Sequence, residues 1–296
     1  MRKHGARALA LFVLTSFPIA AVADDTAYRA SVEKWRQEYE AQLKAEGGWL
    51  SVSGLFWLHE GNNTFGSAPT NDIVLPAAAP AEAGVFQFHA GKTVVRVKPG
   101  VALTQGGKLV TSAELRPDES EDQIALGDLK MYIHQSGQRF AVRLKDKNSA
   151  LRKNFLGLRW YPIDPAYRVV AKWVPYDKPH VAQVQNIMGD IGTEEIPGYA
   201  EFSLRGQTVR LEGDVGDGEI EFVIRDLTSG HGTYGAARFV VGPAPSDGKV
   251  VIDFNEAYNP PCAYNPYTTC PLPFPGNRMK IAIEAGEKSY IGHAAH

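Results

Sequence analysis

Cysteine is scarce in this 296-residue sequence, which holds only Cys262 and Cys270. Two thiols without a nearby cysteine or histidine pair at a recognised spacing make a poor zinc motif. The sequence also lacks an HExxH pair, an EF-hand loop and a GxSxG nucleophile elbow. We therefore expect no metal and no cofactor.

Positive charge is not in excess, because 31 Lys and Arg stand against 33 Asp and Glu. A nucleic-acid-binding chain carries clustered Lys and Arg on one face or along one helix. Nothing in this sequence resembles such a footprint. We expect no nucleic-acid partner and no attraction to anionic membranes.

The apolar run at the N-terminus, residues 8–22, is too short for a membrane-spanning helix. Two hydroxyl residues and a proline interrupt it, and a bilayer needs roughly 20 apolar residues. Arg2, Lys3 and Arg7 precede the run and small residues end it at Ala23, which is the order of a secretory signal peptide.

We predict that residues 1–23 are a signal peptide and that the mature chain is periplasmic or secreted. Removal of three basic residues leaves a net charge of about −5. A retained anchor is the alternative. After cleavage we expect no stable membrane insertion.

A helix is predicted over residues 25–46, within an N-terminal segment of residues 24–48. Apolar and aromatic residues recur there every three or four positions, which places them on one face of a helix. Gly47 and Gly48 end the pattern. We expect the face to pack on a sheet; it consists of Tyr28, Val32, Trp35, Tyr39 and Leu43.

From Trp49 onward the sequence changes to short β-like runs separated by Gly, Pro, Asn and Asp. Such spacing predicts an all-β sandwich or barrel. In a first segment, residues 49–150, strands are predicted at 49–58, 72–75, 85–89, 93–98, 108–115, 129–135 and 140–145.

A break in the pattern at residues 146–158 places a boundary near Ala150 and begins a C-terminal β segment, residues 151–296. The fold class is mainly β: one β-sandwich, a second sandwich or barrel-like segment, and one N-terminal helix. Whether the two segments form one domain or two stays open. Strands of the second segment are predicted at 167–174, 180–186, 199–204, 208–212, 219–225, 236–241, 249–254 and 279–284, with a hairpin turn at 216–218.

Residues 64–76, TFGSAPTNDIVLP, resemble the opening of a forkhead-associated β-sandwich, in which a strand turns through a glycine into an Asn-Asp-Ile-x-Leu run. The resemblance covers residues 64–145 and implies that fold for the first segment. Phosphothreonine-binding members carry an Arg just after the glycine, whereas Ser67 follows Gly66 here. The Ser of the usual Ser-x-x-His loop is also absent, so we do not expect phosphopeptide binding.

The loop of residues 253–278 is dense in Asn, Tyr and Pro and contains both cysteines. In an oxidising compartment we expect Cys262 and Cys270 to form a disulfide that fixes this loop. A metal site or a reactive thiol is the alternative. The amides and rings suit a sugar or a peptide, and equally a loop that must satisfy its own backbone groups.

A second polar cluster, residues 225–238, follows another predicted strand. Strand ends that converge can gather such groups in one pocket. We consider Asp226, His231 and Asp253 as candidate catalytic acids and bases. The structural alternative is that the two acids end strands and accept backbone hydrogen bonds or pair with Arg238 and Arg278.

The ligand-binding candidates are polar or aromatic residues of these two clusters. Ser229 stands near Asp226 and His231 in the sequence, but catalytic triads are recognised by geometry and not by proximity in the chain. The full set is Ser229, Tyr234, Arg238, Asn255, Glu256, Tyr258, Asn259, Asn277 and Arg278.

Several segments are similar to the bacterial family called domain of unknown function 1684. The similarity runs from about Trp49 to Lys288 and rests on GWLSVSGLFWLHEG, NNTFGSAPTNDIVLP, RDLTSGHGTYGAARF, DFNEAYNPPCAYNPYTTCPLPFPGNR and EAGEK. The family has no assigned activity, so the resemblance implies no catalytic residues. It marks the segments 226–238 and 253–278 as family signatures.

We predict an exported protein that binds a small polar ligand, such as a sugar or a cell-envelope fragment, between strand-end loops. A hydrolase that uses Asp226 or Asp253 with His231 is the first alternative. A non-catalytic interaction module of the envelope is the second, and it would present an exposed apolar patch instead of a polar pocket. The sequence predicts no oligomeric state.

Overall fold

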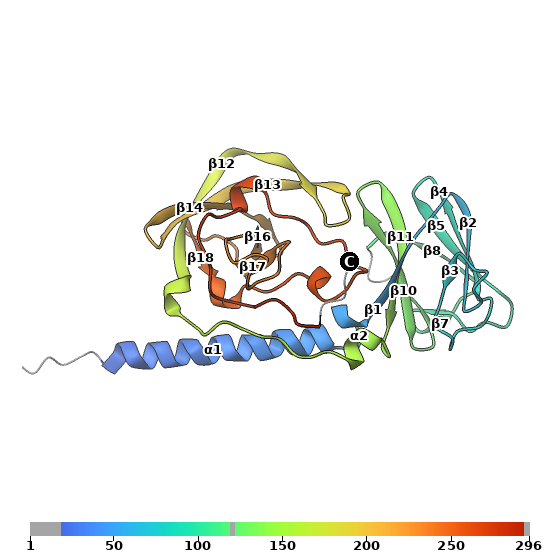
Figure 1. Ribbon diagram of the computed structural model, residues 1–296. Helices are drawn as coiled ribbons and strands as arrows, with labels where there is room; N and C mark the ends of the chain where they lie inside the picture. Colours follow the sequence, from blue (N-terminus) through green and yellow to red (C-terminus); the bar gives the residue numbers. More distant parts are fainter. Residues whose placement is uncertain (1–18, 119–121, 293–296) are drawn as a thin grey trace, which may run out of the picture.

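The computed structural model describes residues 19–118 and 122–292. It begins with the long helix α1 (Ile19–Lys44), which runs along one side of the C-terminal β structure, while the N-terminal β structure lies beyond its far end (Figure 1). The predicted helix is therefore confirmed, and it starts six residues earlier than expected. Most of the predicted signal peptide, residues 1–18, lies outside the described residues.

The apolar stripe of α1 faces the protein, where Trp35 and Tyr39 contact Trp160 and Tyr258 of connecting segments and not the predicted sheet. Val32 and Leu43 are buried, and Trp35 and Tyr39 are half-buried. Arg36 lies one position from the stripe and is 5% exposed, with its guanidinium donating to the carbonyls of Tyr161 and Asn255. Among the described residues, no helix combines the length and apolar character needed to cross a membrane.

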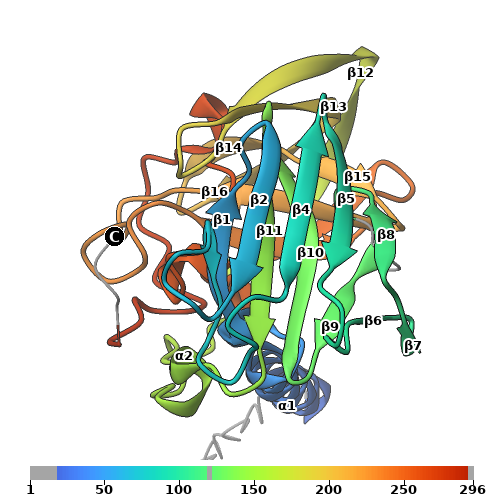
Figure 2. The ribbon, with the colours of Figure 1, turned by 90° about the vertical axis from the view of Figure 1, so that its right-hand side faces the viewer.

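The N-terminal sandwich, residues 52–146, consists of two antiparallel-rich sheets that face each other (Figure 2). One sheet has the order β1 (Val52–Trp57), β11 (Arg139–Asp146), β10 (Leu129–Ser136), β9 (Ile124–Leu126), β6 (Thr104–Gln105) and β7 (Lys108–Leu109). The other has the order β3 (Ile73–Val74), β2 (Gly61–Gly66), β4 (Gly84–His89), β5 (Lys92–Val97) and β8 (Ser112–Leu115).

One apolar core fills the space between these sheets. Phe65 and Phe86 from one sheet pack with Met131, Ile133 and Val142 from the other, all nearly without exposure. The short helix α2 (Ala150–Lys153) follows the sandwich, and Ser149 caps it by accepting from the backbone N–H of Arg152. The forkhead-associated resemblance stays a prediction.

The C-terminal sandwich also has two sheets. One has the order β14 (Gln207–Glu212), β13 (Ile191–Leu204), β12 (Arg168–Gln185) and β18 (Lys249–Asp253); the other has the order β15 (Asp214–Gly216), β16 (Glu219–Ile224) and β17 (Arg238–Pro243). The described strands do not close into a barrel. Short 3₁₀ turns complete the chain at Trp49–Ser51, Pro165–Tyr167, Phe254–Glu256, Pro261–Ala263 and Pro275–Asn277.

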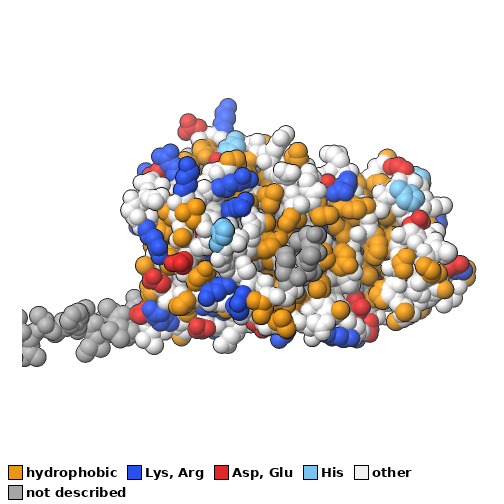
Figure 3. Space-filling model, viewed as in Figure 1, with side chains coloured by type: hydrophobic (Ala, Val, Ile, Leu, Met, Phe, Trp, Pro, Cys, Tyr) orange, Lys and Arg blue, Asp and Glu red, His pale blue; other side chains and the backbone are white. Residues whose placement is uncertain are grey.

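The core of the C-terminal sandwich follows the two-residue period of its strands. Ile220, Phe222 and Ile224 of β16 point inward and meet Phe202 and Leu211 from the facing sheet. On the face shown in Figure 3, Lys and Arg lie mainly over this sandwich, with acidic and apolar side chains between them. The mainly β fold class is confirmed.

The predicted hairpin turn at residues 216–218 is confirmed, since Gly216 pairs with Glu219 between β15 and β16. Asp217 and Gly218 take φ values of 52° and 81°, the positive values that a tight two-residue hairpin requires.

Four of the predicted strands need correction. The runs 167–174 and 180–186 form one long strand, β12, and the run 108–115 is split between β7 and β8. Residues 279–284 form no strand. Their backbone bonds go elsewhere: Ile283 N donates to the Asp226 carboxylate, and Ile281 O accepts from Leu227 N.

Candidate functional site

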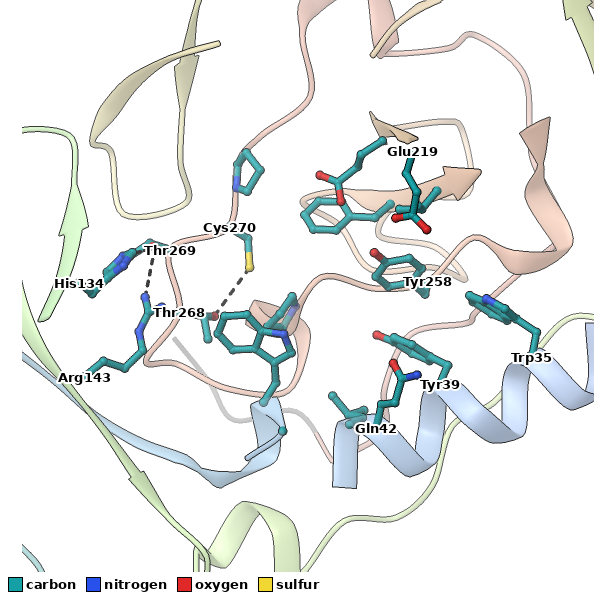
Figure 4. Close-up of a pocket in the computed structure, with 18 residues that line it drawn as sticks. Trp35, Tyr39, Gln42, His134, Arg143, Glu219, Tyr258, Thr268, Thr269 and Cys270 are labelled. Atoms are coloured by element: carbon teal, nitrogen blue, oxygen red, sulfur yellow. Dashed lines mark hydrogen bonds between the residues drawn. The ribbon is translucent and has the colours of Figure 1, made fainter. Parts of the chain in front are cut away.

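A cavity of about 730 Å³ lies where the two sandwiches and the end of α1 meet (Figure 4). Five separate parts of the chain contribute to it: α1, the turn at residues 48–49, the β10–β11 pair, the β16–β17 pair and the loop of residues 253–278. The lining side chains are Trp35, Tyr39, Gln42, Leu43, Trp49, His134, Arg143, Glu219, Glu221, Phe239, Val241, Tyr258, Pro261, Thr268, Thr269, Cys270 and Pro271, with Gly48 between them.

Strand alternation explains the wall from the N-terminal sandwich. On β10, Met131 and Ile133 point into the sandwich core, so Tyr132 and His134 point to the opposite face. Tyr132 stands directly across from Arg143 of β11, which shares this outer face. Arg143 is only 4% exposed because the C-terminal sandwich covers it.

The facing wall comes from the outer face of β16 and β17. Glu219 and Glu221 alternate with the inward-facing Ile220, and Phe239 and Val241 project on the same side from β17. Burial, and then the nearby charges of other acidic groups, raise the pKa of Glu221 to about 7. This wall carries two carboxyl groups, whereas the opposite wall carries Arg143.

Aromatic rings form the floor between these walls. Trp35 and Tyr39 of α1 stack with centroids 5.5 Å apart and planes 2° apart, and Tyr258 lies 4.7 Å from Tyr39. Trp49 lines the cavity with 40% of its surface exposed. The arrangement offers π faces beside polar groups.

The loop of residues 253–278 is held against the N-terminal sandwich. The side-chain amide of Asn265 donates to the carbonyls of Trp49 and Val52, at 3.0 and 2.7 Å. Farther along the loop, Thr269 reaches the outer face of β10 and β11. Its Oγ1 lies 2.8 Å from Nε2 of His134 and accepts from Nη2 of Arg143 at 3.3 Å.

His134 is bound on its other side by a carboxylate. Its Nδ1 lies 2.8 Å from Oδ1 of Asp118, whose second oxygen accepts from the backbone N–H of Gln135. Burial raises the pKa of Asp118, but the hydrogen bond and charge of His134 outweigh it and hold that pKa below its ordinary value. Asp118, His134 and Thr269 thus form a continuous hydrogen-bonded chain at the cavity.

Cys262 and Cys270 do not form the predicted disulfide in the structure. Both are buried and not at disulfide distance; Sγ of Cys270 instead accepts from the backbone N–H of Cys262 at 3.2 Å. Hydrogen bonding to Cys270, together with burial, raises the pKa of the Cys262 thiol.

Asp226 and Arg238 form an ion pair at 2.7 Å whose side chains are 0% and 1% exposed. The other oxygen of Asp226 accepts from Thr228 and from the backbone N–H of Ile283, while Arg238 also donates to the carbonyls of Ile283 and Ala285. These contacts tie β17 to the C-terminal segment. Asp226 therefore pairs with Arg238, which is the structural alternative to a catalytic role.

Asp253 does not pair with Arg278. The hydroxyl of Tyr28 donates to its carboxylate, with Oη 2.8 and 3.0 Å from the two oxygens, and Nε of Arg168 lies 3.7 Å away. The expected pairing with Arg278 is wrong because Asp253 ends β18 opposite Arg168 of β12, on the side covered by α1. Arg278 is exposed on the far end of the loop.

Asn255 and Asn277 hold neighbouring backbone segments together. Asn255 is buried and bridges Tyr28 Oη and both backbone groups of Asp164, and Asn277 bridges Glu212 and Val223. These contacts fit the alternative in which the polar side chains of the loop serve to hydrogen-bond backbone groups.

Glu256, next to Asp253, is half-buried. Burial and then the Asp253 charge raise the pKa of Glu256 to about 7.

Asn259 belongs to a buried cluster that sequence reasoning missed. It donates through its backbone and side chain to Glu287, which is 0% exposed and also accepts from Tyr264 Oη at 2.5 Å. Burial raises the pKa of Glu287 to about 8, although the hydrogen bonds from Tyr264 and Asn259 lower it. The EAGEK segment thus supplies a buried carboxylate that fastens the loop.

The remaining predicted residues lie apart from the cavity. His231 is exposed in the turn after β16, where Ser229 Oγ accepts from the backbone N–H of Asp226. Tyr234 is half-buried and donates to the carbonyl of Cys262 at 3.4 Å. Of the predicted catalytic and ligand-binding residues, Tyr258 alone lines the cavity. The acid and base roles of Asp226, His231 and Asp253 stay a prediction.

The residues that the sequence did not single out are Asp118, His134, Arg143, Glu221 and Thr269. His134 and Arg143 each interrupt an apolar alternation on a predicted strand, which is the only signal that they carried. Thr269 stood inside the segment 253–278, but nothing in the sequence paired it with His134.

These features define a mainly β protein of two packed sandwiches with a polar cavity at their junction. The family model described as protein of unknown function (DUF1684) matches residues 153–288, and the chain belongs to this family. Asp118, His134 and Arg143 lie before the matched residues, and Thr269 lies within them.

A solution NMR structure of an uncharacterized protein from Haloarcula marismortui is similar to part of the chain. Its sequence is 30% identical, and the match covers 48% of this chain and 81% of the other, with a TM-score of 0.40. No curated protein matches the chain.

Proposed function

We propose that the protein binds a small polar ligand, a sugar or a sugar-bearing cell-envelope fragment, in the cavity between the two sandwiches. The observation that carries this proposal is the cavity itself, since about 730 Å³ lies within the range of small-molecule sites. Loops and strand ends held on two rigid β scaffolds supply its lining.

The chemistry of the lining supports this ligand class. The exposed ring of Trp49 and the half-buried ring of Tyr258 offer apolar faces for a pyranose ring. Glu219 and Glu221 can accept from hydroxyl or amino groups, and Arg143 can donate to a carbonyl or carboxylate at the other end. An amino sugar with an acyl or acidic substituent would meet both kinds of group.

Substitution of Trp49 tests the proposal. Loss of one aromatic face is worth roughly 0.5–1.5 kcal/mol beyond area burial, so we expect Trp49→Ala to weaken binding of a soluble disaccharide–peptide fragment of peptidoglycan about tenfold. Isothermal titration calorimetry measures the affinity. Trp57→Ala is the matched control, because Trp57 stacks on Arg139 outside the cavity. Equal effects of both substitutions, or no binding by the unmodified protein to this fragment or to N-acetylglucosamine oligomers, would count against the proposal.

We also propose that the protein acts outside the cytoplasm, on the strength of the basic, apolar and small-residue order of residues 1–23. Expressed from its own N-terminus in a bacterial host, the mature chain is expected to begin at Asp24 and to leave the cytoplasmic fraction. N-terminal sequencing and cell fractionation check both points, with a chain lacking residues 2–23 as control. Recovery of an uncleaved chain in the cytoplasm contradicts export.

A further inference from the structure

We propose that Thr269, His134 and Asp118 are the nucleophile, the general base and the orienting carboxylate of an esterase site that removes an acyl group from the bound sugar. The inference rests on the proposed function for the sugar and on the Asp118–His134–Thr269 chain for the chemistry. None of these three residues belongs to the acid and base set predicted from the sequence.

The hydrogen-bond chain fixes the tautomer of His134. An ionised carboxylate only accepts, so the contact of 2.8 Å to Asp118 Oδ1 requires the proton on Nδ1 of His134. In the neutral imidazole Nε2 then carries a lone pair that can accept the hydroxyl proton of Thr269, whose Oγ1 also lies at 2.8 Å. This is the order of roles by which catalytic triads are recognised on unrelated folds.

Asp118 is itself held in place. The backbone N–H of Gln135 donates to its Oδ2, and the backbone N–H of Asp118 donates to the carbonyl of Ile133, so the carboxylate is bound to the strand that carries His134. The lowered pKa of Asp118 keeps it ionised near neutral pH, as an orienting role requires.

Arg143 supplies the positive charge that the developing oxyanion needs. Its Nη2 donates to Thr269 Oγ1 at 3.3 Å, and its Nε is buried with no hydrogen-bond partner among the described residues. The guanidinium lies 5.7 Å from the ring centroid of Trp49, which limits its freedom. Because Arg143 lines the cavity, its guanidinium places a positive charge beside a carbonyl oxygen bound next to Thr269.

The reaction balances with water as the co-reactant. Thr269 Oγ1 bonds to the ester carbon while its proton passes to His134 Nε2, and the ester carbonyl becomes an oxyanion beside Arg143. Collapse breaks the bond to the sugar oxygen, which takes the proton from Nε2 and leaves as an alcohol. Water then attacks the acyl-threonine, its proton passes to Nε2 and on to Thr269 Oγ1, and a carboxylic acid is released.

A structural role is the competing explanation, since Thr269 also joins the two sandwiches. Two substitutions separate the roles. Thr269→Val preserves the shape but removes the hydroxyl, whereas Thr269→Ser keeps it. If Thr269 is the nucleophile, the Ser variant retains turnover and the Val variant loses it. If Thr269 is only a packing contact, the two variants have equal turnover.

The experiment measures hydrolysis of p-nitrophenyl acetate and acetate release from glucosamine pentaacetate by the full chain and its variants. General acid–base catalysis contributes typically about 10²- to 10⁴-fold, so we expect Thr269→Val and His134→Asn to lose at least about 100-fold in kcat. Thr269→Ser should retain turnover. A fluorophosphonate probe should add its mass to the peptide that contains Thr269, a readout that needs no variant to fold.

Absence of both turnover and adduct in the unmodified chain would overturn the inference, as would equal turnover in Thr269→Val and the unmodified chain. Calorimetry with the peptidoglycan fragment separates this failure from failure of the proposed function. Binding without turnover or adduct contradicts the esterase inference and leaves the proposed binding function standing. Turnover of p-nitrophenyl acetate without sugar binding contradicts the proposal that the ligand is a sugar.

Discussion

Replacing Arg238 by Ala is expected to destabilise the protein by about 3–5 kcal/mol and to lower Tm by roughly 10 °C. The substitution leaves the Asp226 carboxylate, which is 0% exposed, without its cationic partner. It also removes the donor from the carbonyls of Ile283 and Ala285. A buried charge and buried carbonyls without partners destabilise the folded state by their full desolvation free energy.

Urea unfolding followed by tryptophan fluorescence measures this effect. Arg278→Ala is the matched control, because Arg278 carries the same charge in the same part of the chain but is exposed. We expect the control to change the free energy of unfolding by less than about 0.5 kcal/mol. Similar losses of unfolding free energy in both variants would mean that the buried ion pair contributes no more to stability than an exposed arginine.

The second large effect is a decline of stability from mildly acidic to mildly alkaline pH. Burial is the largest cause for each group, and it raises the pKa of Glu221 and Glu256 to about 7 and that of Glu287 to about 8, from an ordinary value of 4.5. Between about pH 4.5 and 8 the folded chain therefore binds more protons than the unfolded chain. The free energy of unfolding falls as pH rises through this window.

Glu287 should supply the largest share of the decline, because it is fully buried and its pKa is raised most. Each pKa unit corresponds to about 1.4 kcal/mol. Glu287→Gln cannot ionise, so the slope of stability against pH between 5 and 8 should become shallower. The slope is the readout, since an amide facing the donors of Asn259 also lowers stability at every pH.

Glu284→Gln serves as control, because Glu284 is exposed and three positions away. Its slope should match that of the unmodified protein. A free energy of unfolding that rises between pH 5 and 8 would contradict the assignment of raised pKa values to these buried carboxylates. Acidic groups with lowered pKa values, such as Asp122 and Asp190, act in the opposite direction but below about pH 4.

Local patterns predicted the elements of the fold and not the partners of those elements. The stripe from Val32 to Leu43 identified α1, and the alternation of runs such as residues 129–135 identified β10. The segment 279–284 has the same alternation, yet its backbone bonds go to Asp226 and to the turn beyond β16. Periodicity reports which face is buried, but a strand also needs a neighbouring strand.

The site was harder to predict for a related reason. Asp118, His134 and Thr269 are separated by 16 and 135 positions, and they meet only because the outer face of one sandwich is covered by a loop of the other. Asp226 and Arg238, in contrast, are close in sequence and dense in polar neighbours, which made them conspicuous. In the structure these polar residues surround a buried ion pair, whose side chains are 0% and 1% exposed.

The contacts of α1 bear on when the fold can be completed during synthesis. Tyr28 on this first helix bonds Asp253, 225 positions later, and Tyr39 bonds the carbonyl of Asn259, 220 positions later. A ribosome must therefore finish nearly the whole chain before the helix finds its partners. Until then the aromatic face of α1 is exposed, and contacts so distant in sequence form slowly. The protein is thus expected to depend on a holding factor, or on delayed folding, more than a chain whose first helix packs against its nearest neighbours.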